Sequence, residues 1–194
     1  GVEEGEYGAR LADDAMATAN HSAVLAARIS YHLDLRGPNL AINTACSSGL
    51  VALHQACESL RNGAAEMALV GSVNLLLSPA PYRAMTHMGM LAPSGACRAF
   101  ADDADGIVPA EAVVALVLKP LSQAQADGDR ILGLIRSSGI NYDGRTNGLT
   151  VPSAPAQEAL LASVYDRAGI DVGRVGYLLA HGTGTRLGDP VEAS

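Results

Sequence analysis

The sequence predicts an α/β fold in which helices cover a largely parallel sheet. Apolar runs of strand length alternate with helical patterns over most of the 194 residues, and such alternation is typical of α/β proteins. Apolar residues make up 48% of the chain and aromatic residues only 4%. Small aliphatic side chains let helices and strands approach closely, so we expect stacked layers around a sizeable core.

The first half of the chain begins, after its first twenty residues, with an amphipathic helical pattern at residues 22–33. A Gly-Pro pair at residues 37–38 marks a turn, and residues 40–43 indicate a short buried strand. We expect a helix to follow that strand and to run to about residue 61. Its small and apolar residues recur at helical spacing and would lie on one face. The Asn-Gly pair at residues 62–63 ends the helix as a C-cap.

The rest of the chain repeats this alternation of strands and helices. We expect strands at residues 67–77, 113–118, 131–140 and 175–180. We also expect one helix that starts at Ser78-Pro79 and another at residues 155–168. Binding and catalytic residues collect at the carboxyl ends of parallel strands. Cys46 and His181 both follow a predicted strand directly, so they are the first candidates for a functional site.

Charge and hydropathy exclude several classes of protein. The chain has 13 Lys and Arg against 20 Asp and Glu, a net charge of −7 with no basic cluster, so we expect no nucleic-acid partner. The longest apolar run, Ala112–Leu118, is too short to cross a membrane, and no membrane association is expected. The first twenty residues are acidic and lack the apolar stretch of a signal peptide, which favours a cytoplasmic location.

Cysteine usage points to reduced thiols. Cys46, Cys57 and Cys97 are an odd number with no CxxC spacing, so they fit neither a disulfide framework nor a zinc site. Cys46 lies between a strand and the first turn of a helix, where unpaired N–H groups favour a thiolate and could hold an oxyanion. A buried, inert cysteine is the competing interpretation. We expect Cys57 to pack in the core and assign Cys97 no role.

His181 opens the sequence HGTGTRLGDPVE directly after an apolar run. A histidine there could donate a hydrogen bond to a substrate carbonyl, or it could merely be satisfied within a loop. The three glycines Gly182, Gly184 and Gly188 imitate a dinucleotide-binding fingerprint, but their spacing is GxGxxxG instead of GxGxxG. We therefore disfavour that alternative.

Asp189 and Glu192 are three residues apart, on one face of a helix whose first turn contains Pro190. The two carboxylates could orient a basic group or bind a cation. They could equally be solvated side chains that the helix macrodipole stabilises. The other histidines are isolated and no HExxH sequence is present, so no metal site is expected.

Several sequences, in this order along the chain, resemble those of the β-ketoacyl synthase domain of modular type I polyketide synthases. They are NTACSS (43–48), ALVGSVN (68–74), MLAP (90–93), CRAF (97–100), ADG (104–106), VLK (117–119), NYDG (141–144), NGLT (147–150) and HGTGT (181–185). The resemblance implies a thiolase-like, layered αβαβα fold, of which this chain is the middle part. Residues 1–130 would be largely the N-terminal half of the domain, and residues 131–194 the start of its C-terminal half.

The resemblance also implies an activity and a set of site residues. Cys46 would be the acylated nucleophile and His181 the first of two catalytic histidines. The second histidine and a lysine would follow the chain, so the 194 residues alone are expected to be inactive. The residues expected to support the site are Thr44, Ser47, Thr183, Thr185, Asp189 and Glu192, with Glu192 near a structural cation in some members.

The implied reaction is a decarboxylative condensation between an acyl chain on Cys46 and a malonyl-type extender, in polyketide chain elongation. Both substrates would be carried on the phosphopantetheine of an acyl carrier protein, and no bound metal or nicotinamide is expected. The implied partners are that carrier protein, a second copy of the domain in a homodimer, and neighbouring domains of a multidomain synthase.

Three alternatives to elongation remain open. A non-elongating domain would only accept or transfer acyl chains, a fatty-acid synthase condensing domain would share Cys46 and His181, and a docking module would have no catalysis. The sequence also departs from the family pattern, with Asn43 where Asp is common and with Ala110 and Ala112 in place of glycines beside Glu111. Neither departure changes Cys46 or His181.

Overall fold

The computed structural model describes residues 21–194, and these form two compact units. Of the described residues, the first unit contains 21–72 together with Val113–Leu132, and the second contains Val73–Ala112 and Gly133–Ser194. The acidic stretch used above to exclude a signal peptide, residues 1–20, lies outside the described residues. The predicted division of the domain near residue 130 stays a prediction.

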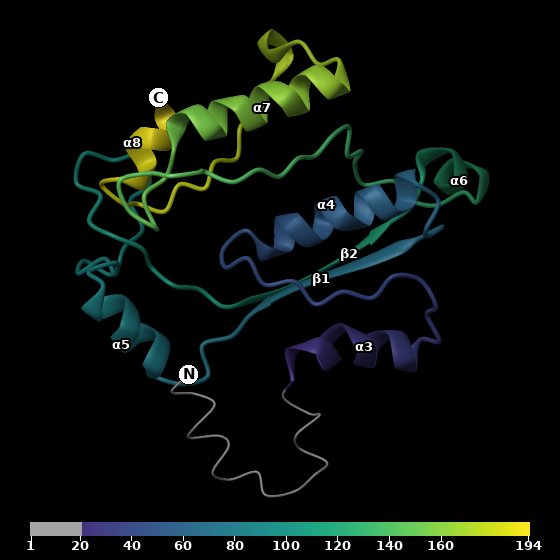
Figure 1. Cartoon of the computed structure of the whole chain (residues 1–194), viewed down its shortest axis with the longest axis horizontal. Coiled ribbons are helices and arrows are strands. Elements are labelled where there is room, and N and C mark those ends of the chain that lie inside the picture. Colours follow the sequence, from purple (N-terminus) through teal and green to yellow (C-terminus); the bar gives the residue numbers. More distant parts are fainter. Residues whose placement is uncertain (1–20) are drawn as a thin grey trace, which may run out of the picture. The chain divides into compact units, whose positions relative to one another are not determined.

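The first unit is built from helices beside a two-stranded sheet (Figure 1). Its helices are α3 (Ser22–His32), α4 (Ser48–Arg61) and α6 (Leu121–Ala126), and its sheet pairs β1 (Ala68–Asn74) with β2 (Ala112–Leu118). These elements confirm the predicted helices at residues 22–33 and up to 61, and the predicted strands at 67–77 and 113–118.

Local sequence explains how α4 ends. Arg61 lies in the last turn, where its charge complements the negative end of the helix dipole, and it pairs with Glu58 at 2.5 Å. Asn62 is the C-cap residue, and Gly63 then takes the left-handed conformation with φ of 74°. Glycine reaches that conformation without a steric cost, so the Asn-Gly pair ends the helix as predicted.

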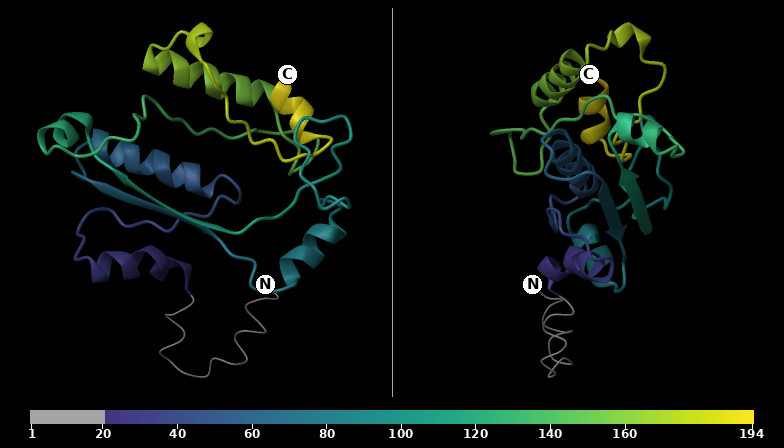
Figure 2. Two further views of the ribbon diagram at one scale, coloured as in Figure 1. Left: turned by 180° about the vertical axis from the view of Figure 1, so that it is seen from behind. Right: turned by 90° about the vertical axis from the view of Figure 1, so that its right-hand side faces the viewer.

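The sheet differs from the prediction of a largely parallel arrangement. Asn74, at the end of β1, donates a side-chain hydrogen bond of 2.6 Å to the carbonyl of Ala110, just before β2 begins. The end of one strand therefore lies beside the start of the other, and the pair is antiparallel (Figure 2). Glu111 reinforces this register, because its carboxylate accepts the N–H of Leu76.

Three predicted strands do not form. Residues 40–43, 131–140 and 175–180 belong to no ladder within the described part of the chain, although their apolar sequences favour strands. A strand requires a hydrogen-bonded neighbour as well as a suitable sequence, and the only sheet in residues 21–194 has two strands. The expectation that strand ends deliver Cys46 and His181 is therefore wrong for these residues.

The predicted sizeable core is also wrong for residues 21–194. The buried apolar residues among them are Cys57, Val70, Ala104 and Ala124. The β2 sequence is apolar throughout, as in strands covered on both faces, yet Val113 and Val117 are 73% and 68% exposed. A sheet of two strands is too narrow to bury both of its faces, so much apolar surface stays open.

The second unit carries α5 (Ala80–His87), α7 (Ala154–Ala168), the short 3₁₀ helix η1 (Val172–Arg174) and α8 (Gly188–Ala193). The predicted helices after Ser78-Pro79 and at residues 155–168 are confirmed. The hydroxyl of Ser153 caps α7 by accepting the N–H of Ala156, and Gly169 ends it in the left-handed conformation. No helix of the described residues is long and apolar enough to span a membrane.

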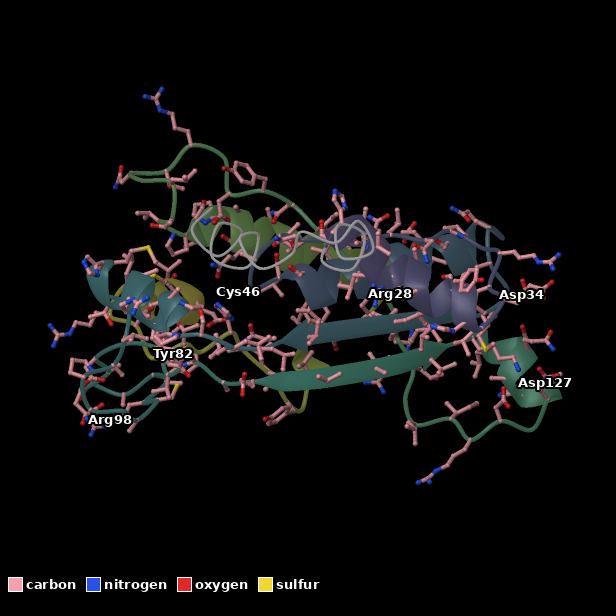
Figure 3. All side chains as sticks on the ribbon, turned by 90° about the horizontal axis from the view of Figure 1, so that it is seen from below. Arg28, Asp34, Cys46, Tyr82, Arg98 and Asp127 are labelled. Carbon is pink, nitrogen blue, oxygen red and sulfur yellow. The ribbon has the colours of Figure 1, made fainter. Side chains whose placement is uncertain are left out.

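A charged cluster closes the loop around α6 and predicts a pH dependence of stability. The ammonium group of Lys119 binds the carboxylates of Asp127, at the end of α6 (Figure 3), and Asp129. These hydrogen bonds raise the pKa of Lys119 above its ordinary 10.5, and the bond from Lys119 lowers the pKa of Asp127 below its ordinary 3.8. The cluster therefore stabilises the fold between these values, and the stabilisation is lost as acid protonates Asp127 or alkali deprotonates Lys119.

We expect Lys119→Gln to lower the melting temperature most between about pH 5 and 9, with the difference from wild type shrinking below about pH 3. Thermal unfolding followed by circular dichroism across this pH range measures the effect. Arg36→Gln is the matched control, because the pair of Arg36 and Asp34 is more than 80% exposed on both sides and should contribute little. A Lys119→Gln difference that stayed constant from pH 2 to 11 would contradict this account.

Candidate active site

Cys46 lies in the turn that leads into α4, two residues before the first helical residue, and its side chain is exposed. Hydrogen bonds between near neighbours build this turn. Ser48 donates both its N–H (3.0 Å) and its hydroxyl (2.6 Å) to the carbonyl of Ala45, and its hydroxyl oxygen accepts the N–H of Thr44 at 2.9 Å. The Ser47 hydroxyl donates to the Thr44 carbonyl at 2.9 Å, and the Asn43 side-chain oxygen accepts the N–H of Ala45 at 3.1 Å.

Backbone strain is concentrated next to Cys46. Ala45 has φ of 55°, in the left-handed region that costs a residue with a β-carbon about 1–2 kcal/mol. The hydrogen bonds on both sides of Ala45 hold it there. Asn43 supplies one of them with an amide oxygen where the family commonly has a carboxylate, so this departure keeps the bond and removes a charge. The result is a sharp turn that presents the thiol on the surface.

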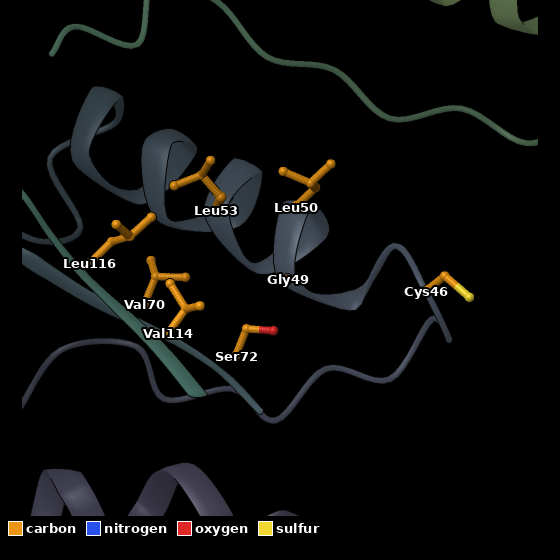
Figure 4. A pocket seen from close by; sticks show the side chains of 8 residues that line it. All are labelled: Cys46, Gly49, Leu50, Leu53, Val70, Ser72, Val114 and Leu116. Atoms are coloured by element: carbon orange, nitrogen blue, oxygen red, sulfur yellow. The ribbon is translucent and has the colours of Figure 1, made fainter. Parts of the chain in front are cut away.

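A pocket of about 240 Å³ lies between α4 and the sheet, with Cys46 at one end (Figure 4). Its lining residues are Cys46, Gly49, Leu50, Leu53, Val70, Ser72, Val114 and Leu116. A β-carbon on Gly49 would lie only 2.9 Å from the hydroxyl oxygen of Ser72, so the glycine lets α4 approach β1 closely. Figure 4 shows the sulfur of Cys46 directed away from the leucine and valine side chains. The pocket is thus an apolar gap between helix and sheet, and the thiol faces outward from it.

The other two cysteines differ from Cys46. Cys57 is buried in α4, and this burial raises the pKa of its thiol above the ordinary 9.0, with Arg61 opposing and Glu58 adding to the shift. This confirms that Cys57 packs in the core. Cys97 is exposed, and its sulfur lies 4.0 Å from the carbonyl oxygen of Gly182. Sequence reasoning did not connect Cys97 with the HGTGT segment.

Glu192 of α8 holds the main chain of His181. Its Oε1 accepts the N–H of His181 at 2.5 Å, and its Oε2 accepts the N–H of Gly182 at 2.8 Å. One carboxylate that receives two successive N–H groups holds the two peptide groups on either side of the intervening α-carbon. The exposed imidazole of His181 therefore projects from an anchored stretch of backbone, although no paired strand precedes it.

Asp189 holds the rest of the turn and is the one buried charged side chain of the described residues, at 4% exposure. Its Oδ1 accepts the N–H groups of Gly184 (3.1 Å) and Thr185 (3.4 Å), and its Oδ2 accepts the N–H of Phe100 at 2.7 Å. Hydrogen bonds to a charged acceptor are stronger than neutral ones, which makes burial of this carboxylate tolerable.

The two threonines predicted to support the site lie between these carboxylates. The hydroxyl oxygen of Thr185 accepts the N–H of Gly188 at 3.0 Å, where α8 begins, and lies 3.3 Å from the hydroxyl of Thr183. Both threonines contribute to the shape of the turn. Whether they also act on a substrate stays a prediction.

These contacts give Asp189 and Glu192 a structural role that neither interpretation of the sequence included. Neither is a solvated side chain at a helix end, since each binds main-chain N–H groups. Residues 21–194 contain no group of three His, Cys, Asp or Glu side chains that could hold a metal ion. The N–H groups of Gly182 and Gly184 bind these carboxylates, so they are not aimed at a dinucleotide phosphate.

A loop at residues 91–107 packs against the histidine turn within the second unit. Its ends are joined by two hydrogen bonds, from the N–H of Ala92 to the carbonyl of Ile107 and from the N–H of Ile107 to the carbonyl of Met90. The N–H of Gly106 donates to the carbonyl of Gly184 at 3.0 Å. Sequence reasoning assigned no role to Gly106 or Phe100, since both lie almost 80 residues or more from the turn they contact.

The family comparison agrees with this geometry. Residues 1–124 match the model described as beta-ketoacyl synthase, N-terminal domain, and residues 132–194 match that of the C-terminal domain. The chain therefore belongs to the β-ketoacyl synthase family. It is 57% identical over 192 residues to the polyketide synthase ThaG of Burkholderia thailandensis. The matched region covers 99% of this chain and 3% of that synthase. It is 50% identical to the polyketide synthase PksM of Bacillus subtilis, with 99% and 4% covered.

Solved ketosynthases have the same fold. The ketosynthase from module 6 of the bacillaene synthase of Bacillus subtilis superposes with a TM-score of 0.88 at 51% identity, over 89% of this chain and 31% of that one. The ketosynthase domain OzmH KS7 for oxazolomycin from Streptomyces albus gives 0.87 at 46% identity, with the same coverage. The predicted ketosynthase resemblance and thiolase-like fold are confirmed, and the chain spans about a third of these solved chains.

Replacing Asp189 tests its part in the turn. In Asp189→Asn, an NH₂ group would face one of the main-chain N–H groups that now donate to the carboxylate. Two donors cannot form a hydrogen bond, so we expect a loss of about 2–3 kcal/mol in the free energy of unfolding. Urea unfolding of a ketosynthase domain that contains this chain measures the loss. Glu158→Gln, on the exposed side of α7, is the control and should change the value by less than about 0.5 kcal/mol. Equal stability of the two variants would refute the proposed anchoring role.

Gly106 offers a second test, of close backbone contact. A β-carbon at this position would lie 2.6 Å from the N atom of Ala92 and the carbonyl carbon of Leu91, and its φ is 147°. Main-chain atoms cannot rotate away, so we expect Gly106→Ala to cost about 3 kcal/mol in unfolding free energy. Gly176→Ala is the control, because nothing lies within 4 Å of its β-carbon position. Denaturation midpoints that shift equally in both variants would show that the contact is not tight.

Proposed function

We propose that this chain supplies the nucleophile and one catalytic histidine of an enzyme that elongates polyketide chains by decarboxylative condensation. The observation that carries the proposal is the exposed thiol of Cys46, held in a hydrogen-bonded turn before α4, in a member of the β-ketoacyl synthase family. The anchored main chain of His181 supports it.

The first half-reaction loads the acyl chain. The thiol of Cys46 loses its proton, and the thiolate attacks the carbonyl carbon of an acyl thioester carried on phosphopantetheine. The carbon–sulfur bond to phosphopantetheine breaks as the new bond to Cys46 forms, and the freed carrier thiol takes up the proton. The partial positive charge at the start of α4 favours the oxyanion that forms on the carbonyl.

The second half-reaction forms the carbon–carbon bond. The bond between the malonyl α-carbon and its carboxylate breaks, carbon dioxide leaves, and the electron pair passes to an enolate. His181 donates a hydrogen bond to the enolate oxygen, together with the second histidine that the family resemblance implies. The α-carbon then attacks the acyl carbon on Cys46, whose carbon–sulfur bond breaks to restore the thiolate. Anchoring of the His181 backbone by Glu192 limits the reorganisation that this step requires.

The partners follow from this chemistry. An acyl carrier protein delivers both thioesters on its phosphopantetheine, and no metal or nicotinamide takes part. The large synthases of similar sequence support neighbouring domains in the same polypeptide. Assembly as a homodimer and a cytoplasmic location stay predictions.

The test of the nucleophile is acyl transfer to Cys46. A ketosynthase domain containing this chain should gain one acyl group from an acyl carrier protein thioester, located by mass spectrometry on the peptide with Cys46. We expect Cys46→Ala to abolish the adduct, while Cys57→Ala and Cys97→Ala keep it. An adduct on a different cysteine, or none on a folded domain, would overturn the assignment.

A second measurement on the same domain separates elongation from mere transfer. His181→Ala should keep acylation of Cys46 within about threefold and reduce release of labelled carbon dioxide from the malonyl thioester by about 100-fold or more, as for lost oxyanion-hole donors. A wild-type domain that becomes acylated but never forms a β-ketoacyl product would be a transfer domain, and the proposal of elongation would be wrong.

A further inference from the structure

Phe100 contacts the segment that carries His181 from a distant part of the sequence. A β-carbon placed on Gly182 would lie 3.1 Å from Cε2 and 3.7 Å from Cζ of Phe100, and 3.4 Å from the β-carbon of Ala99. The edge of the aromatic ring therefore lies on the side of Gly182 where a side chain would project. Phe100 as a whole is 49% exposed, so its position beside Gly182 is not simply that of a side chain buried in a core.

The backbone of Phe100 is strained and firmly held. Its φ of 59° lies in the left-handed region, which is unusual for a bulky residue. Its N–H donates to Asp189 at 2.7 Å, and beside it Arg98 pairs with Asp103 at 2.7 Å. Strained residues persist where surrounding contacts determine them, and they are concentrated at functional sites. The strained residue is the one whose ring lies beside Gly182.

Glu192 and Phe100 hold the His181 segment through different groups. Glu192 binds the N–H groups of His181 and Gly182, which holds the two peptide groups on either side of the His181 α-carbon. The Phe100 ring occupies the space that a side chain on Gly182 would need, and Gly182 has φ of 52°. Without the ring, Gly182 could move toward the vacated space and lengthen the bond from its own N–H to Glu192. Because that bond holds one of the two peptide groups beside the His181 α-carbon, such a movement would shift the imidazole.

We propose that Phe100 is a positioning residue for His181, whose ring holds Gly182 and thereby sets the direction of the imidazole. This inference rests on the proposed function of His181 in decarboxylation and condensation. Because acylation of Cys46 does not require His181, loss of the ring should affect the second half-reaction selectively. An interaction needed in the transition state changes kcat more than KM.

The experiment compares Phe100→Ala with wild type in a ketosynthase domain that contains this chain. We expect kcat for condensation with a malonyl thioester to fall at least tenfold, with KM changed less than threefold and the rate of Cys46 acylation kept within threefold. Phe100→Leu retains a bulky apolar side chain and should restore at least half of the wild-type kcat. The matched control is Tyr82→Ala on α5, a half-exposed aromatic residue of the same unit, which should leave both half-reactions unchanged (Figure 3).

The outcomes separate this inference from the proposed function. Normal condensation by Phe100→Ala, or an equal loss of acylation and condensation in both Phe100 variants, would overturn the positioning role. Condensation at the wild-type rate by His181→Ala would instead overturn the proposed function, whatever the Phe100 variants do.

Discussion

The arrangement around His181 depends on a single buried carboxylate. Removing an ionised carboxylate from water costs several kcal/mol unless hydrogen bonds replace those to the solvent. Asp189 meets this requirement with three main-chain donors, from Gly184, Thr185 and Phe100. The donors lie in two loop segments that could otherwise adopt many conformations. The carboxylate stabilises the one conformation in which all three N–H groups point toward it. The loop at residues 91–107 and the histidine turn are therefore mutually dependent.

The two turns that carry the proposed catalytic residues are stabilised by different chemistry. Neutral groups build the turn at Cys46, where hydroxyls and one amide oxygen accept or donate within a few residues. No acidic side chain takes part in the hydrogen bonds described for that turn, so the thiol has no carboxylate among the groups that shape its backbone. Carboxylates build the turn at His181, where Glu192 and Asp189 accept main-chain N–H groups. Neutral acceptors thus hold one turn and charged acceptors hold the other.

The sequence predicted the features that depend on local contacts. Residue periodicity, Pro155 and the Asn62-Gly63 pair were sufficient for the helices, and the apolar stretches at β1 and β2 were sufficient for the two strands. The same reasoning failed at residues 131–140 and 175–180, because strand formation depends on a neighbour that local sequence does not specify. It also failed to decide what Asp189 and Glu192 bind.

Phe100 shows most clearly why part of the site escaped sequence reasoning. The sequence CRAF, which ends at Phe100, contributed to the family resemblance but predicted no contact. Nothing in local sequence connects Phe100 with a glycine 82 positions later. Cys46 could be identified from its position before a helix because its turn is short. His181 could be identified from its glycine-rich surroundings, whereas the groups that hold it could not.

The sequence separations of these hydrogen bonds also bear on the order of folding. The bonds of the Cys46 turn join residues two to four positions apart, whereas Phe100 and Asp189 are 89 positions apart. Closing a loop about twenty times longer costs roughly 3 kcal/mol more in chain entropy. Contacts of long sequence separation are correspondingly slow to form. During synthesis the nucleophile turn can assemble soon after its residues emerge, while the histidine turn must wait until α8 has been made and has found the loop at residues 91–107.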